Sequence, residues 1–465
     1  MASHLKSVFD TQKEHFLTDV TKSYVWRIDQ LDRLERLLVE NQQAITEALG
    51  QDFKTAWFEQ SMEFYGTLGA IAHAKQELKE WMAPQAANLP KRFSESGHRA
   101  QVYREPYGVC LVIAPFNAPI ILTLEPLIAA LSAGNTVIVK PAETTVALST
   151  LYEELFAKYF QPENVALVRG GRDVVTDLLS FPFDFIFFTG STQVGKVIMR
   201  AAAENLTPVL LELGGQNPVL VDETANLDDA AEKIVWGATA FGGQWCVSPG
   251  YVYVHESVAE PFVEACKAAV FKQYGEDPKS SPDFSRIVTE RDVDRLSAML
   301  DGAPIIVGGT VSRDERYVAP TIVFPARWTD PVMKTEIFGP ILPIMTYSEL
   351  DEVINVVKRQ PKSLAAYVFS RDEAVVNRLL QTLSFGGGAV NQTMVQCLLS
   401  SSLPFGGVGP SGLGRYYGKY GFDSLSHLKS VVFSPADVSV DVLLPPYTEE
   451  KRRELGEWFA EPEAR

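Results

Sequence analysis

The feature that most constrains how this chain folds is a repeated alternation of short apolar runs with helix-like stretches. Five such runs occur between residues 109 and 211, and each is followed by turn residues: 109–114, 136–139, 165–168, 185–188 and 209–211. Strands that alternate with helices are typical of a parallel sheet packed on both faces. The sequence therefore predicts an α/β fold.

A second series of the same kind begins after Gly214 and Gly215. It comprises strands at 217–221 and 250–254, a helix at 258–271, and later strands near Ile305, Ile341 and Ala366. Two such series predict two α/β units, with the boundary close to Glu212.

The first part of the chain is predicted to be helical. Apolar residues recur at helical spacing from Ile28 to Ile45, with charged residues between them, and the segment 64–81 repeats the pattern. Pro84 and Pro90 then break it. A helical block should therefore precede the first strand.

Two alternating stretches, 99–105 and 429–434, fit neither unit. We expect them to pair as an outlying ribbon. The exposed edge of such a ribbon favours pairing with a second copy, so a homodimer is the expected assembly.

Composition and charge exclude several classes of protein. A chain of 465 residues with 46% hydrophobic residues forms a large core in about two or three domains. The net charge of -16 disfavours attraction to nucleic acid or anionic lipid. We find no apolar run long enough for a membrane anchor and no signal-peptide pattern at the N-terminus.

The cysteines point to a reducing compartment. Only four occur, Cys110, Cys246, Cys266 and Cys397, without the CxxC spacing of a zinc site or a disulfide framework. We therefore expect free thiols, no metal and a cytoplasmic protein.

Cys246 is the most informative single residue. It lies in the segment 241–250 (FGGQWCVSPG), where a glycine-rich approach lets a substrate come close to the backbone. A cysteine at the start of a helix gains thiolate character from the helix dipole, which favours a nucleophile. A buried, inert cysteine is the alternative, and it is the usual fate of a free thiol.

Glu212 is a carboxylate inside an apolar run that ends at two glycines, in the segment 210–216 (LLELGGQ). Removal from water raises a carboxyl pKa toward the range of a general base. A structural carboxylate held by the Gly214 and Gly215 amides is the alternative.

Asn117 directly follows the first predicted strand, between Pro115 and Pro119. A side-chain amide held in this way can donate a hydrogen bond to a developing oxyanion. A simple turn asparagine is the alternative.

Two further segments have the chemistry of nucleotide binding. Lys140 ends a strand where α/β sheets bind ligands, and Glu143 follows it, so the pair can hold the hydroxyls of a ribose. Ser191 and the amides near Gly190 open a helix and can face a phosphate. A solvated ion pair and an ordinary helix cap are the alternatives.

Glu336 and Phe338 form a compact acid and aromatic pair, suited to a second ribose and a flat ring. A turn with an incidental aromatic residue is the alternative. The aromatic residues Trp236, Phe241 and Trp245 near the cysteine favour an apolar pocket for a medium-chain or aromatic ligand, or else they are core packing.

Taken in order, these segments resemble the aldehyde dehydrogenase superfamily over almost the whole chain. The cysteine follows the glutamate by 34 positions, as expected of the family. The matching motifs are 115–117 (PFN), 140–143 (KPAE), 188–192 (FTGST), 212–215 (ELGG), 243–246 (GQWC), 336–340 (EIFGP) and 404–407 (PFGG).

Finer features resemble the class 3 branch, which is typically dimeric and often accepts both NAD and NADP. These are 24–28 (YVWRI), 411–419 (SGLGRYYGK), 426–427 (SH) and 445–448 (PPYT). The resemblance implies a Rossmann-like cofactor-binding domain (1–98 and 107–212), an α/β catalytic domain (213–425), an oligomerisation ribbon (99–106 and 426–440) and a tail (441–465).

The resemblance also implies roles for individual residues. Cys246 attacks an aldehyde, Asn117 stabilises the oxyanion, and Glu212 activates the water that hydrolyses the thioester, with hydride passing to NAD or NADP and no metal required. The implied cofactor site comprises Lys140, Glu143, Gly190, Ser191, Val194, Glu336 and Phe338. The implied substrate pocket comprises Phe116, Trp236, Trp245 and Asn391.

The sequence departs from the family at four positions. Trp245 stands where the family commonly has a smaller residue, and Phe116 stands where it frequently has Trp. Both changes are expected to reshape the aldehyde pocket. Ala142 replaces a frequent Ser near the adenosine site, and Tyr417 replaces a His. The absence of the hydroxyl at Ala142 leaves the choice between NAD and NADP open.

Two alternative functions remain. A CoA-acylating dehydrogenase transfers the acyl group to CoA instead of water, and the presence of Glu212 argues against it. A catalytically idle binding protein on the same fold is the other, and the joint presence of Cys246, Glu212 and Asn117 argues against that.

Overall fold

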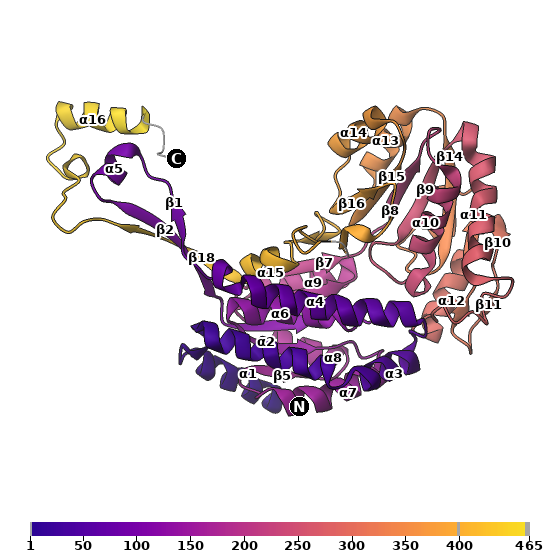
Figure 1. The fold of residues 1–465 in the computed structure, drawn as a ribbon, viewed down its shortest axis with the longest axis horizontal. Coiled ribbons are helices and arrows are strands. Elements are labelled where there is room, and N and C mark those ends of the chain that lie inside the picture. Colours follow the sequence, from indigo (N-terminus) through magenta and orange to yellow (C-terminus); the bar gives the residue numbers. More distant parts are fainter. Residues whose placement is uncertain (1, 398–399, 461–465) are drawn as a thin grey trace.

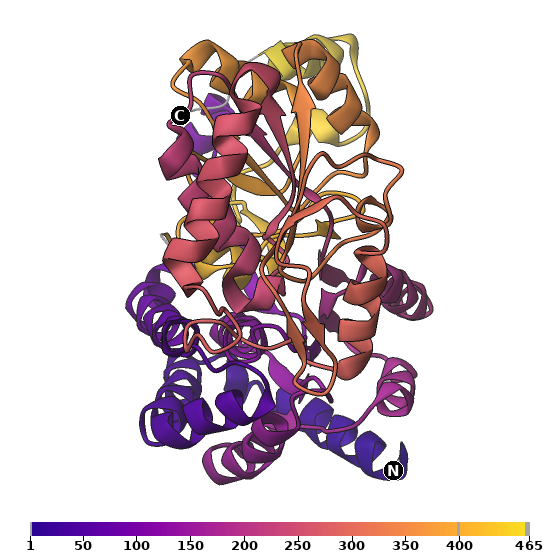
Figure 2. The same cartoon turned by 90° about the vertical axis from the view of Figure 1, so that its right-hand side faces the viewer.

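The computed structural model describes residues 2–397 and 400–460. It contains two α/β units and a ribbon that projects from the first of them (Figure 1). In the view turned by 90°, the second unit lies above the first, and the N-terminal helices form the opposite end of the molecule (Figure 2).

The chain begins with the predicted helical block. Its helices are α1 (Ala2–Phe16), α2 (Tyr24–Val39), α3 (Gln42–Asp52) and α4 (Trp57–Trp81). α2 and α4 pack on the buried helix α6 (Ile121–Ala133), and their apolar faces supply Leu31, Leu34 and Leu78 to the core.

The first unit is built on a six-stranded sheet in the order β17-β7-β6-β3-β4-β5. Five strands are parallel and match the predicted runs: β3 (Val109–Ile113), β4 (Thr136–Lys140), β5 (Val165–Leu167), β6 (Phe185–Gly190) and β7 (Val209–Leu213). The helices that follow these strands are α6, α7 (Val146–Tyr159), α8 (Arg172–Leu179) and α9 (Thr192–Ala203).

Alternate residues of β3 show why the strands are apolar throughout. Cys110 and Val112 pack in the same core cluster as residues of α2, α4 and α6, whereas Leu111 and Ile113 pack with residues of α1, α8 and α9. Both faces of the sheet are therefore covered, as the uninterrupted apolar runs predict.

The second unit has a seven-stranded sheet in the order β10-β13-β14-β9-β8-β15-β16, parallel except for β10. Its strands are β8 (Asn217–Val221), β9 (Pro249–His255), β10 (Ile305–Val307), β13 (Thr321–Val323), β14 (Ile341–Tyr347), β15 (Ala365–Phe369) and β16 (Gly387–Val390). Its helices are α10 (Leu227–Thr239), α11 (Ala259–Tyr274), α12 (Glu290–Met299), α13 (Leu350–Arg359) and α14 (Glu373–Thr382), and β11 (Val311–Ser312) pairs with β12 (Tyr317–Val318).

The projecting ribbon contains the two segments that the sequence sets apart. β2 (Arg99–Pro106) and β18 (Ser426–Phe433) pair antiparallel, from Arg99 opposite Phe433 to Pro106 opposite Ser426. β1 (Gln85–Ala87) adds a third strand to β2, and β18 forms the other edge. Beyond them, α5 (Lys91–Glu95) and α16 (Glu449–Ala460) lie side by side, with the Phe93 and Trp458 rings 4.8 Å apart.

The structure divides the predicted catalytic segment 213–425. Strand β17 (Gly412–Leu413) pairs antiparallel with β7, and α15 (Gly418–Ser424) packs on α6 and α4, so residues 412–424 belong to the first unit. Apolar periodicity does not detect a two-residue strand that contains glycine, because Gly412 and Leu413 form a strand only by pairing with the edge of β7.

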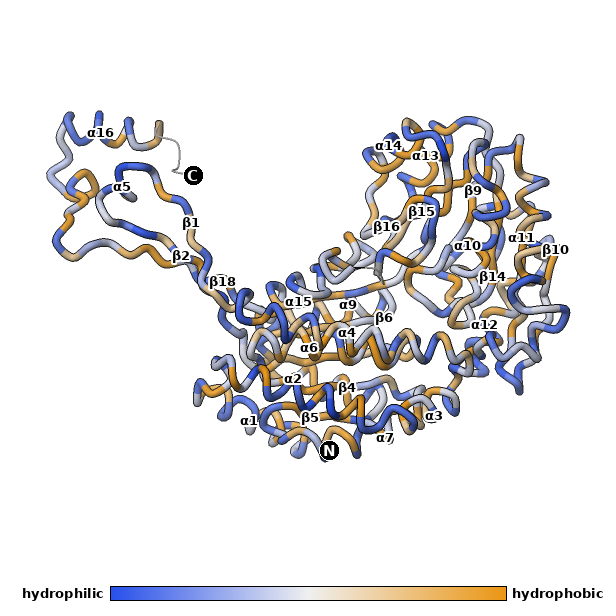
Figure 3. The backbone as a smooth tube through the Cα atoms, viewed as in Figure 1, coloured by the Kyte–Doolittle hydropathy of each residue, from blue (hydrophilic) through white to orange (hydrophobic). Residues whose placement is uncertain are grey.

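Hydropathy follows these layers. The apolar colour gathers in the strands of the second sheet and along α6, whereas polar residues dominate the outer helix α16 (Figure 3). Over the described residues, no helix combines the length and the apolar character that crossing a bilayer requires.

Candidate active site

Glu212 lies near the carboxyl end of β7, between Thr189 of β6 and Gly412 of β17. It is only 1% exposed. Burial is the main influence on its pKa, which is raised to about 8; contacts with Cys246 and Thr189 oppose this shift and the Glu336 carboxylate adds to it. Glu212 is therefore a buried carboxyl, adjacent to Cys246, that exchanges its proton near neutral pH.

Cys246 lies in a turn between a short 3-10 helix (Ala240–Gly243) and β9, and it is 7% exposed. The expectation of a cysteine at the start of a helix is therefore wrong. Gly242 and Gly243 have positive φ angles, and Pro249 begins β9, so the segment between them is too short for a helix.

Buried Asn217 holds the cysteine turn in place. Its Nδ2 donates to the carbonyls of Cys246 and Ser248, both at 2.8 Å, and its Oδ1 accepts from the amide of Ala365 at 2.8 Å. Sequence reasoning missed this residue as a site component. The available signal was a polar side chain at the start of an apolar strand, where burial requires hydrogen-bond partners.

Asn117 lies in the loop after β3 and is 2% exposed. Its side-chain Nδ2 has no hydrogen-bond partner among the described residues. A buried amide donor without a partner is costly in a folded protein unless a ligand completes it.

A cluster of three buried charged residues, Lys54, Glu59 and Glu63, supports this loop and the cysteine segment together. Lys54 Nζ forms an ion pair with Glu63 and donates to the backbone oxygen of Asn117 at 2.8 Å. Glu63 accepts from the amide of Ile120 at 2.9 Å. We call these three residues the Lys54 cluster.

The Lys54 cluster also reaches the segment that leads to Cys246. Glu59 accepts from the amide of Phe241 at 2.5 Å and from the hydroxyl of Ser285 at 2.6 Å, and Lys54 Nζ lies 4.1 Å from the centroid of the Phe241 ring. Burial lowers the pKa of Lys54, while the two glutamates act in the opposite direction. The sequence does not reveal this cluster, because its members resemble the polar face of a surface helix.

The segment 336–340 packs against two loops, the loop after β7 that contains Gly214 and Gly215, and the loop that leads from Gly243 to Cys246. Glu336 accepts from the amide of Gly215 at 3.1 Å, and a Cβ atom at Gly214 would lie 2.1 Å from the Glu336 carboxylate. At Gly243, which has a φ of 70°, a Cβ atom would lie 2.2 Å from Gly339. These two glycines therefore permit a close approach that any side chain would block.

Glu336 and Phe338 thus lie beside the predicted catalytic residues. Burial raises the pKa of Glu336 to about 7. The Phe338 ring packs edge to face on Phe116, next to Asn117, with centroids 5.7 Å apart.

The residues predicted for the adenosine and phosphate groups lie at the carboxyl ends of β4 and β6. Lys140 is buried and pairs with exposed Glu143. Burial is the largest single influence on the pKa of Glu143, but the hydrogen bond and the charge of Lys140, together with a backbone hydrogen bond, outweigh it and lower this pKa. Ser191 follows Gly190 and caps α9 by accepting from the amide of Val194 at 3.4 Å. Val194 is exposed in the first turn of α9.

The four residues predicted for the substrate pocket have different surroundings. Trp245 is buried against Phe241, with ring centroids 4.0 Å apart, which is the core-packing arrangement. Phe116 packs between Phe53 and Phe338, and Trp236 is half-buried against the core. The side chain of Asn391 bonds to the backbone of Ser370 at 2.9 Å through both its oxygen and its nitrogen.

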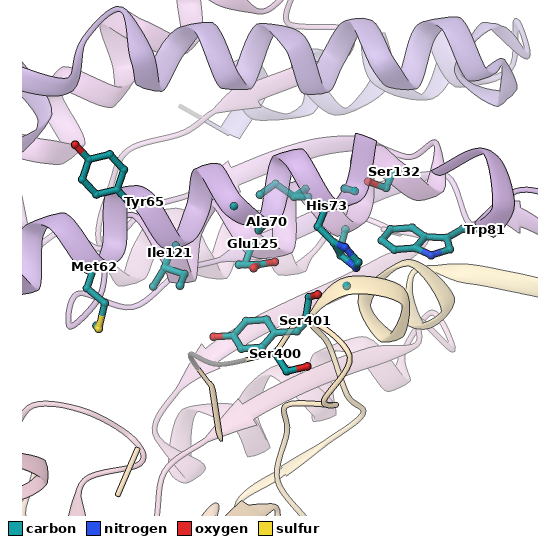
Figure 4. Close-up of a pocket in the computed structure, with 17 residues that line it drawn as sticks. Met62, Tyr65, Ala70, His73, Trp81, Ile121, Glu125, Ser132, Ser400 and Ser401 are labelled. Carbon is teal, nitrogen blue, oxygen red and sulfur yellow. The ribbon is translucent and has the colours of Figure 1, made fainter. Parts of the chain in front are cut away.

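A cavity of about 520 Å³ lies between α4, α6 and residues 400–418 (Figure 4). Tyr417, which departs from the family pattern, contributes to its wall and stacks on Phe405 at 5.2 Å. The lining residues are Met62, Tyr65, Gly66, Gly69, Ala70, His73, Ala74, Trp81, Ile121, Glu125, Ile128, Ala129, Ser132, Ser400, Ser401, Tyr417 and Gly418, and they include none of the four predicted pocket residues.

The chain matches the model of the aldehyde dehydrogenase family over residues 9–431. It is 42% identical to 4,4'-diaponeurosporen-aldehyde dehydrogenase of Staphylococcus aureus, over 95% of this chain and 96% of that protein. Mammalian and plant relatives are members of aldehyde dehydrogenase family 3.

Solved structures give the same picture. A substrate-bound structure of Staphylococcus aureus AldH superposes with a TM-score of 0.95 at 40% identity, covering 98% of this chain and 99% of that one. A glyceraldehyde-3-phosphate dehydrogenase from Methanocaldococcus jannaschii, complexed with NADP, has a TM-score of 0.81 at 25% identity, covering 93% and 95%.

Proposed function

The chain belongs to the aldehyde dehydrogenase family, and on that basis we propose that Cys246, Asn117 and Glu212 carry the reaction. The enzyme oxidises aldehydes to carboxylic acids with NAD or NADP. The observation that carries the residue assignment is the adjacency of the Cys246 thiol to a buried carboxyl whose pKa is about 8.

In this proposal the Cys246 thiolate attacks the aldehyde carbon and forms a thiohemiacetal. Asn117 Nδ2 and the Cys246 amide donate hydrogen bonds to the resulting oxyanion. The partnerless amide of Asn117 supports this role, since the oxyanion supplies the missing acceptor.

A bound nicotinamide would supply the hydride acceptor, and loss of hydride from the carbon of the thiohemiacetal leaves a thioester on Cys246. Glu212 then takes a proton from water, and the resulting hydroxide attacks the thioester carbon and releases the acid. A carboxyl acts as a base only when ionised, so turnover should rise with pH through about 8.

The residues present fit a nicotinamide dinucleotide. The buried Lys140 and exposed Glu143 would hold the adenosine ribose, and the first turn of α9, from Ser191 to Val194, would face the phosphates. Glu336 and Phe338 would hold the second ribose and the ring, since both lie beside the catalytic loops.

We propose that the aldehyde's hydrocarbon tail occupies the 520 Å³ cavity. Its wall includes Ile121, Ile128 and Trp81, which suit medium-chain aliphatic or aromatic aldehydes. The relative from Staphylococcus aureus, named for the aldehyde of 4,4'-diaponeurosporene, is consistent with an apolar substrate.

We further propose a cytoplasmic homodimer. Cys110, Cys246 and Cys266 are buried and form no disulfide with one another, as a reducing compartment allows. The edge strand β18 carries the exposed apolar residues Leu428 and Val432, on which a second copy can pair. The molar mass in solution, measured by light scattering, tests this assembly.

The function is tested by following reduced cofactor with a panel of aliphatic and aromatic aldehydes, each with NAD and with NADP. We expect turnover without CoA. Turnover only in the presence of CoA would show that the thiol of CoA, and not water, accepts the acyl group, and would remove the role proposed for Glu212. Absence of turnover with every aldehyde would indicate a binding protein.

A further inference from the structure

We propose that Glu125 forms a subsite that selects aldehydes carrying an ammonium group on the tail. The proposal rests on the function proposed above, because it assumes that the tail lies in the 520 Å³ cavity. It adds a specific chemical preference to an otherwise apolar wall.

Glu125 lies on α6, a helix whose thirteen residues are all buried. It lines the cavity and is 8% exposed, and among the described residues burial is the one influence on its carboxyl, with no hydrogen bond or ion pair to it. Figure 4 shows it between Ile121 and His73 and facing Ser401. A buried carboxyl without a partner is costly, so its presence in a cavity indicates a ligand that completes it.

The surroundings of Glu125 contain little positive charge. From α4, His73 and Tyr65 are the titratable side chains that line the cavity, and from the segment 400–418 it is Tyr417. Neither lysine nor arginine occurs among the lining residues that the structure describes. Burial alone raises the pKa of Glu125 to about 8, so an incoming cation is the group that would stabilise its ionised form.

The buried side chain of Tyr416 does not line the cavity, but it is close to groups on both sides, Glu125 of the cavity wall and the proposed catalytic residues. Burial raises the pKa of the Tyr416 hydroxyl well above its usual value, and nearby Tyr417, Glu212, Cys246 and Glu125 add to the shift. Tyr416 is therefore near both the proposed catalytic pair and Glu125. An aldehyde held at Cys246 by its carbonyl end would extend its tail toward Glu125.

The cavity has the shape and the aromatic rings that an ammonium group needs. A Cβ atom added to Gly69 on α4 would meet no other atom within 4 Å, so this helix face leaves room for a bulky head group. Trp81 and Tyr417 supply aromatic rings, whose faces attract cations. A tail ending in a carboxylate would meet Glu125 with the same sign of charge and is disfavoured.

The test compares aldehydes of equal chain length that end in a methyl, a carboxylate or a trimethylammonium group, over a series of lengths. For each we measure kcat/KM between pH 6 and 10, a range chosen to span about two pH units on either side of the Glu125 pKa of about 8. The ratio of the ammonium to the methyl substrate is the readout, because the ionisation of Glu212 affects both substrates equally and cancels.

We expect this ratio to rise about tenfold as the pH increases through 8, since Glu125 is then ionised. In Glu125→Gln, which keeps the shape of the side chain, the ratio should be independent of pH. Ser132→Ala, at another polar position of the wall, serves as the matched control and should keep the wild-type ratio.

A ratio that is independent of pH in the wild type, or one that Glu125→Gln leaves unchanged, would overturn the subsite. If the Gln variant does not fold, the wild-type ratio and competitive inhibition by tetramethylammonium, expected to strengthen above pH 8, still decide the question. Normal turnover of the methyl substrate without any charge preference removes this proposal alone, whereas no turnover of any aldehyde removes the proposed function.

Discussion

The buried carboxyls that contact the loops of Asn117 and Cys246 differ in whether a cation accompanies them. Glu63 and Glu59 share the buried Lys54, which ties them to the loops that carry Asn117 and Phe241. Glu212 has no cationic partner among the described contacts, and its closest influences are a thiol, a hydroxyl and a second carboxylate.

One fold thus uses buried glutamates in two ways, to support loops (Glu59 and Glu63) and to take part in the proposed reaction (Glu212). Beside the buried ammonium of Lys54 the two carboxyls fix the geometry of both loops, at the cost of removing ions from water, and burial still raises the pKa of Glu59 to about 7 although Lys54 opposes this shift. A carboxyl buried without a cation has a raised pKa and can exchange a proton near neutral pH. The predictions below test this division.

The largest effect is expected at the thiol beside Glu212. Cys246→Ala should abolish turnover, because no nucleophile remains to form the thioester, while cofactor binding survives. Formation of reduced cofactor, together with cofactor binding by fluorescence titration, measures both properties. Wild-type turnover in this variant would contradict the assignment of the nucleophile.

The second effect concerns the carboxyl that lacks a cation. Glu212→Gln should lower steady-state turnover by about 10²–10⁴-fold, because loss of a general base typically costs this much. Acylation should persist, so an acyl group should accumulate on Cys246 as added mass on the intact protein. Normal turnover that still rises through pH 8 would assign the base to another residue.

The third effect concerns the supporting cation. Lys54→Met leaves Glu63 buried without its partner, so we expect a loss of about 3–5 kcal/mol in the free energy of unfolding. We also expect kcat of the folded enzyme to fall, because the Asn117 carbonyl loses its hydrogen bond, while the Kd of the cofactor stays unchanged.

The matched control for this variant is Lys75→Met. Lys75 lies on α4 and pairs with Asp32 and Glu35 near the surface, so its loss should cost less than about 1 kcal/mol and leave kcat unchanged. Equal effects of the two substitutions on denaturant unfolding and on kcat would show that the buried lysine has no special role in supporting the site.

The smallest effect is the pH dependence of stability at Glu212. The pKa of this group is raised on folding, so its contribution is fully present below the unfolded value near 4.5 and is lost as the pH rises through about 8. Glu212→Gln should therefore unfold at a Tm a few degrees above the wild type at about pH 9, with little difference at about pH 5. A wild-type Tm that does not fall relative to the variant over this range would contradict the raised pKa.

Local patterns were sufficient for much of the fold. The uninterrupted apolar runs at 109–114 and 136–139 became β3 and β4, because a strand covered on both faces has no polar side. The stretches 99–105 and 429–434 were separable because their alternation matched neither unit, and they pair as β2 and β18.

Some residues of the proposed site could be recognised from their local sequence, and others could not. Cys246 and Glu212 have unusual neighbours in the sequence: the thiol follows a pair of glycines, and the carboxyl lies in an apolar run. In the structure Glu212 is buried and lies next to Cys246. Lys54, Asn217 and Glu125 have no such local signature, because a charged or polar residue in a loop, at a strand start or on a helix is ordinary until its burial is known.

The sequence by itself determined the alternation of strands and helices, the outlying ribbon and the residues whose local surroundings are chemically unusual, since these depend on neighbours along the chain. Only the tertiary structure decided that Cys246 lies in a turn, that Trp245 packs against Phe241, that β17 returns to the first sheet, and that Glu125 faces a cavity. Burial and partnership are set by segments far apart in sequence, and they decide whether a carboxylate supports a loop or exchanges a proton.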